Sequence, residues 1–217
     1  MTAVGHDMDE WVTLCEDLPV FPLPDLAMLP GSLLPLHVFE ARYQDLVAHC
    51  LVHGGAIGVG TLRPGYGEDY EGSPAIHEEV GVGQIVSHEP TEDGRCNIII
   101  RAMGSAIVHG EHPQTQRFRR FECRWVETDR KGSARAIQRL RLLLVQLGST
   151  SPRAAKEVGR MMEMEGLTMV DLLAGQVLST ASERRRYLRM GRVLDRVAWM
   201  ESRLAAYLVS ETPSLES

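Results

Sequence analysis

The sequence predicts an α+β fold in which a β-rich part precedes a helical part. Two observations lead to this fold class. Short apolar runs bounded by glycine and proline fill the first 129 residues, whereas helix caps and apolar residues at helical spacing dominate from residue 130 onward. Because strands and helices are segregated along the chain, an α+β fold is expected rather than an alternating α/β sheet.

The charge of the chain changes sign at the same place. The 217 residues include 23 Lys or Arg and 29 Asp or Glu, which gives a net charge of -6. Residues 1–129 carry 8 basic and 20 acidic side chains, and residues 130–217 carry 15 and 9. The predicted organisation is an N-terminal tail (1–16), a β-rich subdomain (17–129), a helical subdomain (130–210) and a C-terminal tail (211–217).

Apolar runs separated by turn signals predict the strands of the first part. They are residues 18–23, 33–36, 56–62, 80–86, 97–101 and 118–126. Prolines in the first run restrict it to an edge or a bulged position. In the last run, Phe121, Cys123 and Trp125 alternate with charged residues, so they are expected to share one face. Glycines at 58–60 and 81–83 indicate bulges or tight barrel bends rather than phosphate-binding loops.

One helix is predicted among these strands. Apolar side chains recur at helical spacing from Phe39 to Leu51, and Gly54 and Gly55 follow them. Phe39 and Tyr43 begin this apolar stripe, so core packing is expected for both.

Three helices are predicted in the second part. Ser133 is expected to cap a helix that ends at Leu147. Ser151, followed by proline, opens a second helix, which Gly166 closes. Thr180 and Glu183 have the spacing of a capping box, and the last helix runs from there to about residue 209.

Several function classes find no support in the sequence. It contains no GxxxxGK[ST], HExxH or GxSxG motif, so no catalytic residues and no cofactor are predicted and the protein is not expected to be an enzyme. No apolar run is long enough for a membrane span and no secretory signal is visible, so a cytoplasmic protein with reduced cysteines is expected. His49 and His53 are four residues apart on a helix, but no carboxylate accompanies them and no metal site is predicted.

Residues 18–43 read LPVFPLPDLAMLPGSLLPLHVFEARY. This segment resembles the opening signature of the Lon protease N-terminal (substrate-binding) domain. Further similar segments follow in the same order, at residues 58–63, 80–85 (VGVGQI), 93–98 (DGRCNI) and 182–200. The resemblance covers about residues 17–208 and implies a PUA-like β-barrel followed by a C-terminal α-helical bundle.

The resemblance also implies a role. In full-length Lon this region recognises substrates, and ATPase and Ser–Lys peptidase domains follow it. The chain is therefore expected to be a standalone, non-catalytic form that binds unfolded polypeptide or a protein partner, as an adaptor in protein quality control. Apolar and flanking polar side chains suit such a surface. The residues expected to form it are Met28, Leu29, His37, Arg42, Tyr66 and Tyr70.

RNA binding by the barrel and the last helix is the alternative function. In a continuous last helix, several arginines fall along one line beside an aromatic ring, an arrangement that suits phosphates and bases. These residues are Arg185, Arg189, Arg192, Arg196, Trp199 and Arg203. A second face, which includes Val193, Val197 and Leu204, is apolar and is expected to be buried. Because the whole protein is acidic, ion pairing or solvation of the arginines is favoured over nucleic acid.

Overall fold

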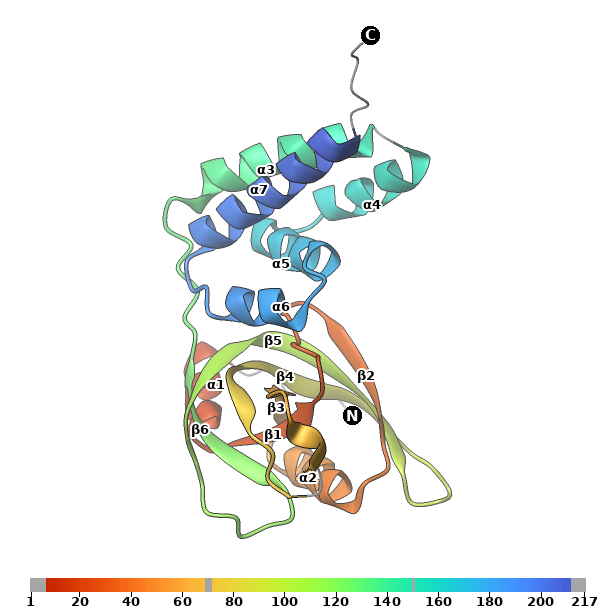
Figure 1. The fold of residues 1–217 in the computed structure, drawn as a ribbon, viewed down its shortest axis with the longest axis vertical. Coiled ribbons are helices and arrows are strands. Elements are labelled where there is room, and N and C mark those ends of the chain that lie inside the picture. The colour runs from red at the N-terminus through yellow and green to blue at the C-terminus, as the bar shows by residue number, and fades with distance from the viewer. Residues whose placement is uncertain (1–6, 69–71, 150, 212–217) are drawn as a thin grey trace. The chain divides into compact units, whose positions relative to one another are not determined.

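The structure, a computed structural model, describes residues 7–68, 72–149 and 151–211 (Figure 1). The chain forms two compact units. Within the described ranges, the first unit holds residues 7–126 and 179–189, and the second holds residues 127–178 and 190–211. The segment 179–189, expected in the helical subdomain, thus belongs to the β-rich unit.

The elements alternate little along the chain, as expected for an α+β fold. The helices are α1 (Met8–Leu14), α2 (Ala41–Val52), α3 (Ser133–Gly148), α4 (Pro152–Met162), α5 (Gly166–Val177), α6 (Ala181–Leu188) and α7 (Val193–Glu211), with short 3-10 turns η1 (Cys15–Asp17) and η2 (Tyr66–Glu68). The strands are β1 (Leu18–Leu23), β2 (Leu33–Val38), β3 (Ala56–Leu62), β4 (Ile76–Pro90), β5 (Cys96–Glu111) and β6 (Arg119–Trp125).

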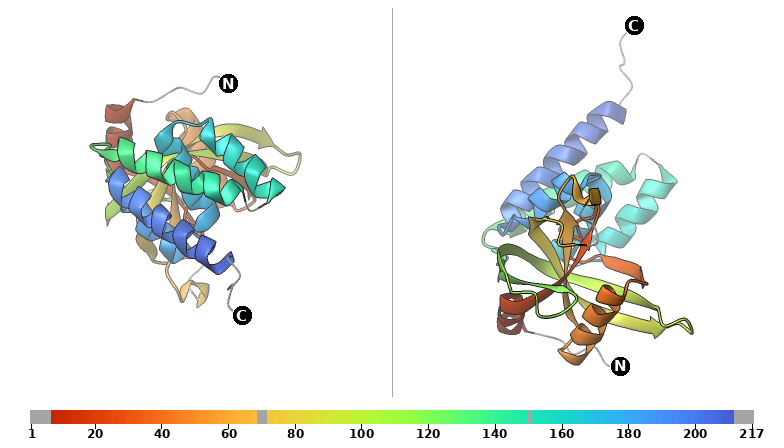
Figure 2. Two further views of the ribbon diagram at one scale, coloured as in Figure 1. Left: turned by 90° about the horizontal axis from the view of Figure 1, so that it is seen from above. Right: turned by 60° about the horizontal axis from the view of Figure 1, so that its bottom comes forward.

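Five strands of the first unit close into a barrel (Figures 1 and 2). Their order is β5-β4-β3-β1-β6, and β6 pairs again with β5. β1 and β3 are parallel, and the other pairs are antiparallel. β2 is added outside this ring, against residues 96–101 of β5, while residues 106–111 of β5 pair with β6. β5 therefore serves both the barrel and the added strand.

β1 lies between β3 and β6, and neither of its two pairings shows a register shift, so the expectation of an edge or a bulged position is wrong. The two pairings are offset along the strand. Pro19 lies in the part that pairs with β6, and Pro22 lies in the part that pairs with β3. Since each proline faces only one paired neighbour, its missing N–H can point to the other side. The prolines are accommodated by staggered pairing rather than by an edge position.

The expected bulges are confirmed. The register shifts between Gly60 and Leu62 and again between Val82 and Gly83. Gly104 in β5 has a different role, because a Cβ added there would overlap the indole of Trp125. Glycine therefore lets the Trp125 ring lie directly against the β5 backbone.

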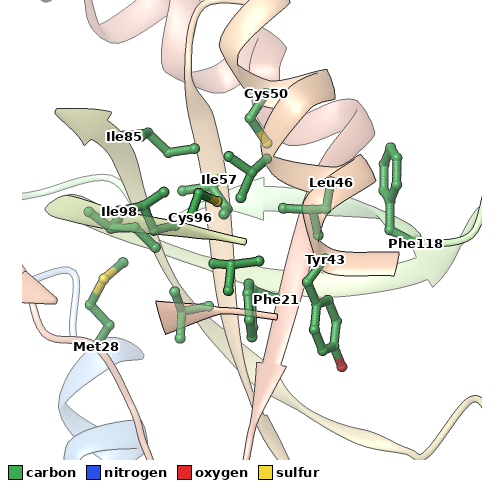
Figure 3. Close-up of a cluster of buried hydrophobic side chains, with 14 of the residues drawn as sticks. Phe21, Met28, Tyr43, Leu46, Cys50, Ile57, Ile85, Cys96, Ile98 and Phe118 are labelled. Atoms are coloured by element: carbon green, nitrogen blue, oxygen red, sulfur yellow. The ribbon is translucent and has the colours of Figure 1, made fainter. Parts of the chain in front are cut away.

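The barrel interior holds two apolar clusters. One joins strand residues to the buried face of α2, with Phe21 and Tyr43 stacked at 4.2 Å and Leu46 fully buried (Figure 3). The other includes Phe121, Cys123 and Trp125, which confirms the predicted face of β6. It also contains Trp11 and Cys15, so residues 8–16, expected to be tail, belong to the folded unit.

Phe39 departs from the expectation that it packs in the core. Its side chain is 60% exposed. The helix begins at Ala41 with Glu40 as its N-cap, so Phe39 precedes the first turn and does not share the buried face of Tyr43.

The second unit is a bundle of α3, α4, α5 and α7, and α3 and α7 lie side by side (Figures 1 and 2). Ser151 caps α4 as predicted, accepting a hydrogen bond from the N–H of Ala154. Ser133, however, is the first residue of α3 after the N-cap Gly132, and its hydroxyl donates to the carbonyl of Arg130. Gly166 does not close a helix but begins α5.

The predicted last helix is two helices. The Thr180–Glu183 capping box is present, but it starts the short α6, and α7 begins only at Val193. The chain between them follows the segment near Asp129. The N–H of Asp129 donates to the carbonyl of Gly191, and its own carbonyl accepts from the N–H of Val193. No helix in the described ranges is both long and apolar enough to cross a membrane.

Candidate functional site

An exposed, partly apolar surface covers the outer side of β2 and the adjoining half of β5. We call it the β2–β5 face. Its four large apolar side chains range from 37% to 60% exposed. The face consists of Leu33, Pro35 and His37 from β2, Phe39 after it, and Asn97, Ile99, Arg101 and Met103 from β5. Large apolar groups gathered in one exposed area are typical of a binding surface.

The face arises from strand alternation and register. In β5, Ile98, Ile100 and Ala102 point into the core, so Asn97, Ile99 and the residues that alternate with them point outward. The register sets Leu33 opposite Arg101, Pro35 opposite Ile99 and His37 opposite Asn97. Outward-facing residues of the two strands are therefore direct neighbours.

Polar groups flank the apolar side chains. Nδ1 of His37 and Oδ1 of Asn97 are 2.8 Å apart, within hydrogen-bonding distance. The ring of His37 also stacks on Phe39, with centroids 6.3 Å apart. These contacts fix the side chains at one end of the face, while Leu33 and Met103 lie toward the other end.

The backbone of β2 is open on the side away from β5. No second strand pairs with β2 anywhere in the ranges that the structure covers. Pro35 has no N–H to donate to β5, so in an antiparallel ladder its backbone position is one that faces the open side. This direction repeats at every second residue of a strand, so the backbone N–H and C=O groups of Leu33 and His37 also face the open side. The open edge thus offers two N–H donors and three carbonyl acceptors. Together, edge and face could hold an extended chain by hydrogen bonds and apolar contacts.

Among the described residues that were expected to bind polypeptide, only His37 lies on this face. Met28 and Leu29 are each 3% exposed, so their side chains are not on the surface. Arg42 lies on α2, where it pairs with Glu40 at 2.8 Å and covers the ring of Tyr43. Tyr66 in η2 packs against the second core cluster, and Tyr70 lies outside the described residues.

The arginines of the alternative hypothesis do not form one face, because α6 and α7 are separate helices. Arg185 and Arg189 belong to the first unit, where Arg189 pairs with Glu78 and Glu79. In the second unit, Arg196 is buried against Asp171, and Arg192 is 62% exposed beside Asp195. Trp199 and Arg203 of α7 are partly buried. The line of charge expected from a continuous helix is therefore wrong.

The binding residues predicted from the sequence did not include Leu33, Phe39, Ile99 or Met103. One signal was available. Three consecutive isoleucines, Ile98 to Ile100, cannot all face the same side of a strand, so at least one apolar residue had to point away from the barrel interior.

Comparisons with known proteins agree with this fold. The family model described as the ATP-dependent protease La (LON) substrate-binding domain matches residues 17–204. Lon protease 2 from Syntrophobacter fumaroxidans is 33% identical over 103 residues. These residues are 47% of the chain but only 13% of that relative.

Two solved structures show the same fold. The N-terminal domain of a Mycobacterium avium complex Lon protease is 13% identical, with a TM-score of 0.66 over 87% of this chain and 98% of that one. A Lon N-terminal domain protein from Xanthomonas campestris is 21% identical, with a TM-score of 0.58 over 91% and 99%. The family model matches most of the sequence, so it shows family membership as well as fold. The chain belongs to the family of ATP-dependent protease La (LON) substrate-binding domains.

Proposed function

We propose that the protein binds extended polypeptide segments on the β2–β5 face, with the bound segment lying along the open edge of β2. The observation that carries this proposal is the combination of that open edge with the exposed side chains of Leu33, Ile99 and Met103. Backbone hydrogen bonds bind any sequence, and apolar contacts select chains that expose hydrophobic residues at alternate positions. Both properties suit recognition of unfolded chains.

We further propose that this binding serves proteolysis, with the protein acting as an adaptor in protein quality control. The family membership supports a substrate-binding role, and the matched relative is named a Lon protease. Binding without catalysis is the simplest activity of the face, since it presents no nucleophile beside a general base.

A binding assay with a defined peptide tests the proposal. The probe is a fluorescein-labelled twelve-residue peptide of alternating valine and threonine. Its binding is measured by fluorescence anisotropy. We expect saturable binding that weakens at least tenfold when Ile99→Gln and Met103→Gln are combined, because each buried apolar side chain contributes about 1.5–3 kcal/mol. The matched control combines Leu142→Gln with Val145→Gln, two residues of α3 that are 60% and 53% exposed.

A second peptide tests the backbone contribution. N-methylation at alternate positions removes the N–H donors that face β2 while it keeps the side chains. We expect this peptide to bind at least tenfold more weakly than its parent. Equal affinity for both peptides would rule out edge pairing, and equal losses in the two double variants would remove the β2–β5 face as the site.

A further inference from the structure

A cavity of about 350 Å³ lies in the first unit, between α6 and the start of β4. We propose that it binds a compact anion that carries two linked phosphate groups, either as inorganic pyrophosphate or as part of a nucleoside diphosphate. Its lining is almost entirely charged or polar. The residues are Arg63, His77, Glu78, Glu79, Ser182, Arg185, Arg186 and Arg189. The volume lies at the small end of the range of ligand pockets.

The lining has an excess of positive charge. Four arginines face two glutamates, in a protein whose net charge is -6. The state of His77 is consistent with this excess. Burial lowers the pKa of His77, and the positive charges of Arg185 and Arg63 lower it further, against an opposing effect of Glu79. A multiply charged anion would balance the excess.

Arg63 is the residue best prepared to receive such a ligand. Its Nε donates a hydrogen bond to the carbonyl of Ile76 at 3.0 Å, and its backbone N–H donates to Ala75 at 2.8 Å. The backbone bond holds the residue in place, and the Nε bond orients the guanidinium. Among the described residues, no side chain accepts a hydrogen bond from its two Nη groups. A guanidinium held in this way presents a fixed pair of donors, which suits the oxygens of a phosphate.

The carboxylates account for only part of the positive charge. Arg189 bridges Glu79 and Glu78, so its charge is used to hold α6 against β4. Nε of Arg185 is 3.9 Å from Oε2 of Glu79, an ion pair that is too long for a hydrogen bond, and Glu79 already accepts a hydrogen bond from Arg189. Arg63 and Arg185 thus supply charge that the glutamates do not fully neutralise. A compact, concave, cationic site favours a small polyanion over an extended acidic chain.

Calorimetric titration of the full chain with sodium pyrophosphate at low salt tests the proposal, with orthophosphate and ADP in parallel. We expect saturable binding of pyrophosphate, weaker binding of orthophosphate, and a loss of at least fivefold in Arg63→Gln. Glu78→Gln removes a competing carboxylate, so it should tighten binding at least threefold, a gain that impaired folding cannot produce. The controls Arg124→Gln and Glu122→Gln make the same charge changes on exposed positions of β6 and should change affinity less than twofold.

The ADP titration identifies the source of the phosphates. Equal affinities for ADP and pyrophosphate would mean that the phosphates alone are recognised, and tighter binding of ADP would add a nucleoside contact; both support the proposal. No saturable binding at 10 mM pyrophosphate would overturn it. So would equal losses in Arg63→Gln and Arg124→Gln, or Arg63-dependent binding of a ten-residue polyglutamate peptide without binding of pyrophosphate.

Discussion

Arg196 and Asp171 form a buried ion pair inside the helical unit. Nη1 of Arg196 lies 2.9 Å from Oδ1 of Asp171, and the two side chains are only 3% and 8% exposed. Nε of Arg196 also donates to the carbonyl of Met190 at 2.7 Å. The pair therefore ties α7 to α5 and to the chain that leads into α7.

Arg196→Ala should destabilise the protein by about 3–5 kcal/mol, because it leaves the Asp171 carboxylate buried without its cation. Urea unfolding followed by circular dichroism measures this loss. Arg192→Ala is the matched control, since the Arg192 side chain is 62% exposed and its loss should cost under about 1 kcal/mol. Equal losses for the two variants would mean that the Arg196 pair contributes no more than a surface pair.

A double variant separates the net contribution of the ion pair from the cost of leaving one charge buried without a partner. Arg196→Met combined with Asp171→Leu removes both charges and keeps side-chain volume. We expect the double variant to lose less stability than Arg196→Ala alone, because no unpaired charge remains buried. If the double variant loses as much stability as Arg196→Met and Asp171→Leu lose together as single variants, the two residues act independently.

Val197→Asp should lower the free energy of unfolding by several kcal/mol. Val197 is 0% exposed, so the new carboxylate would be buried without a partner. Ala198→Asp places the same side chain on the next residue of α7, which is exposed, and should change stability by less than about 1 kcal/mol. Thermal or urea unfolding of both variants decides which face of α7 is buried.

Sequence prediction succeeded where the signal is local. The capping residues Ser151 and Thr180 and the alternation of Phe121, Cys123 and Trp125 each depend on residues a few positions apart. The break between α6 and α7 depends instead on backbone hydrogen bonds with Asp129, more than sixty residues away in the sequence. Helical periodicity continues across Gly191, so the pattern alone predicts one helix.

The candidate site was less predictable than the fold for the same reason. The β2–β5 face depends on the register in which residues 33–38 pair with residues 96–101. The sequence of either segment alone does not determine that register. Met28 shows the opposite error. It follows a turn-rich segment and looks available, but its backbone and Cβ lie against the position of Gly81, and the side chain packs in the core. Exposure of an apolar residue is set by tertiary packing.

Gly104→Ala should destabilise the barrel by about 1–3 kcal/mol, since the added methyl would overlap the Trp125 ring inside a packed core. Gly159→Ala is a control for which the opposite change in stability is expected. Gly159 lies within α4 with open space around its Cα, so alanine should stabilise the helix by about 0.5–1 kcal/mol. Chemical unfolding of both variants checks the prediction, and a neutral Gly104→Ala would mean that Trp125 can move aside.

Stability should fall as the pH drops below about 6.5, partly through His49. Burial lowers the pKa of His49, and the nearby His53 and Arg120 lower it further, against Asp17. The folded state thus favours the neutral imidazole, and the unfolded state binds a proton at a higher pH. The stabilisation is present above the unfolded pKa and is lost on acidification.

Urea midpoints at pH 7.5 and pH 5.5 measure this dependence. His49→Gln should reduce the difference between the two midpoints. His88→Gln, which changes an exposed histidine of β4, should leave the difference as it is in the unmodified protein. If His49→Gln leaves the pH dependence unchanged, the acid sensitivity arises from other groups.

The cysteines should be unreactive in the folded protein. All four are free and buried. Burial raises the pKa of Cys15, Cys50 and Cys123 to about 12 and raises that of Cys96 as well. Because the thiolate is the reactive form, Ellman's reagent at pH 8 should find almost no thiol until urea unfolds the chain, and four thiols afterwards. Rapid labelling of the native protein would show that the barrel opens often enough to expose these groups, and comparing labelling rates for Cys50 beneath α2 and Cys123 in β6 would locate the opening.

The same pKa shifts predict that stability falls as the pH rises above about 9, where thiols of the unfolded chain ionise and those of the folded protein do not.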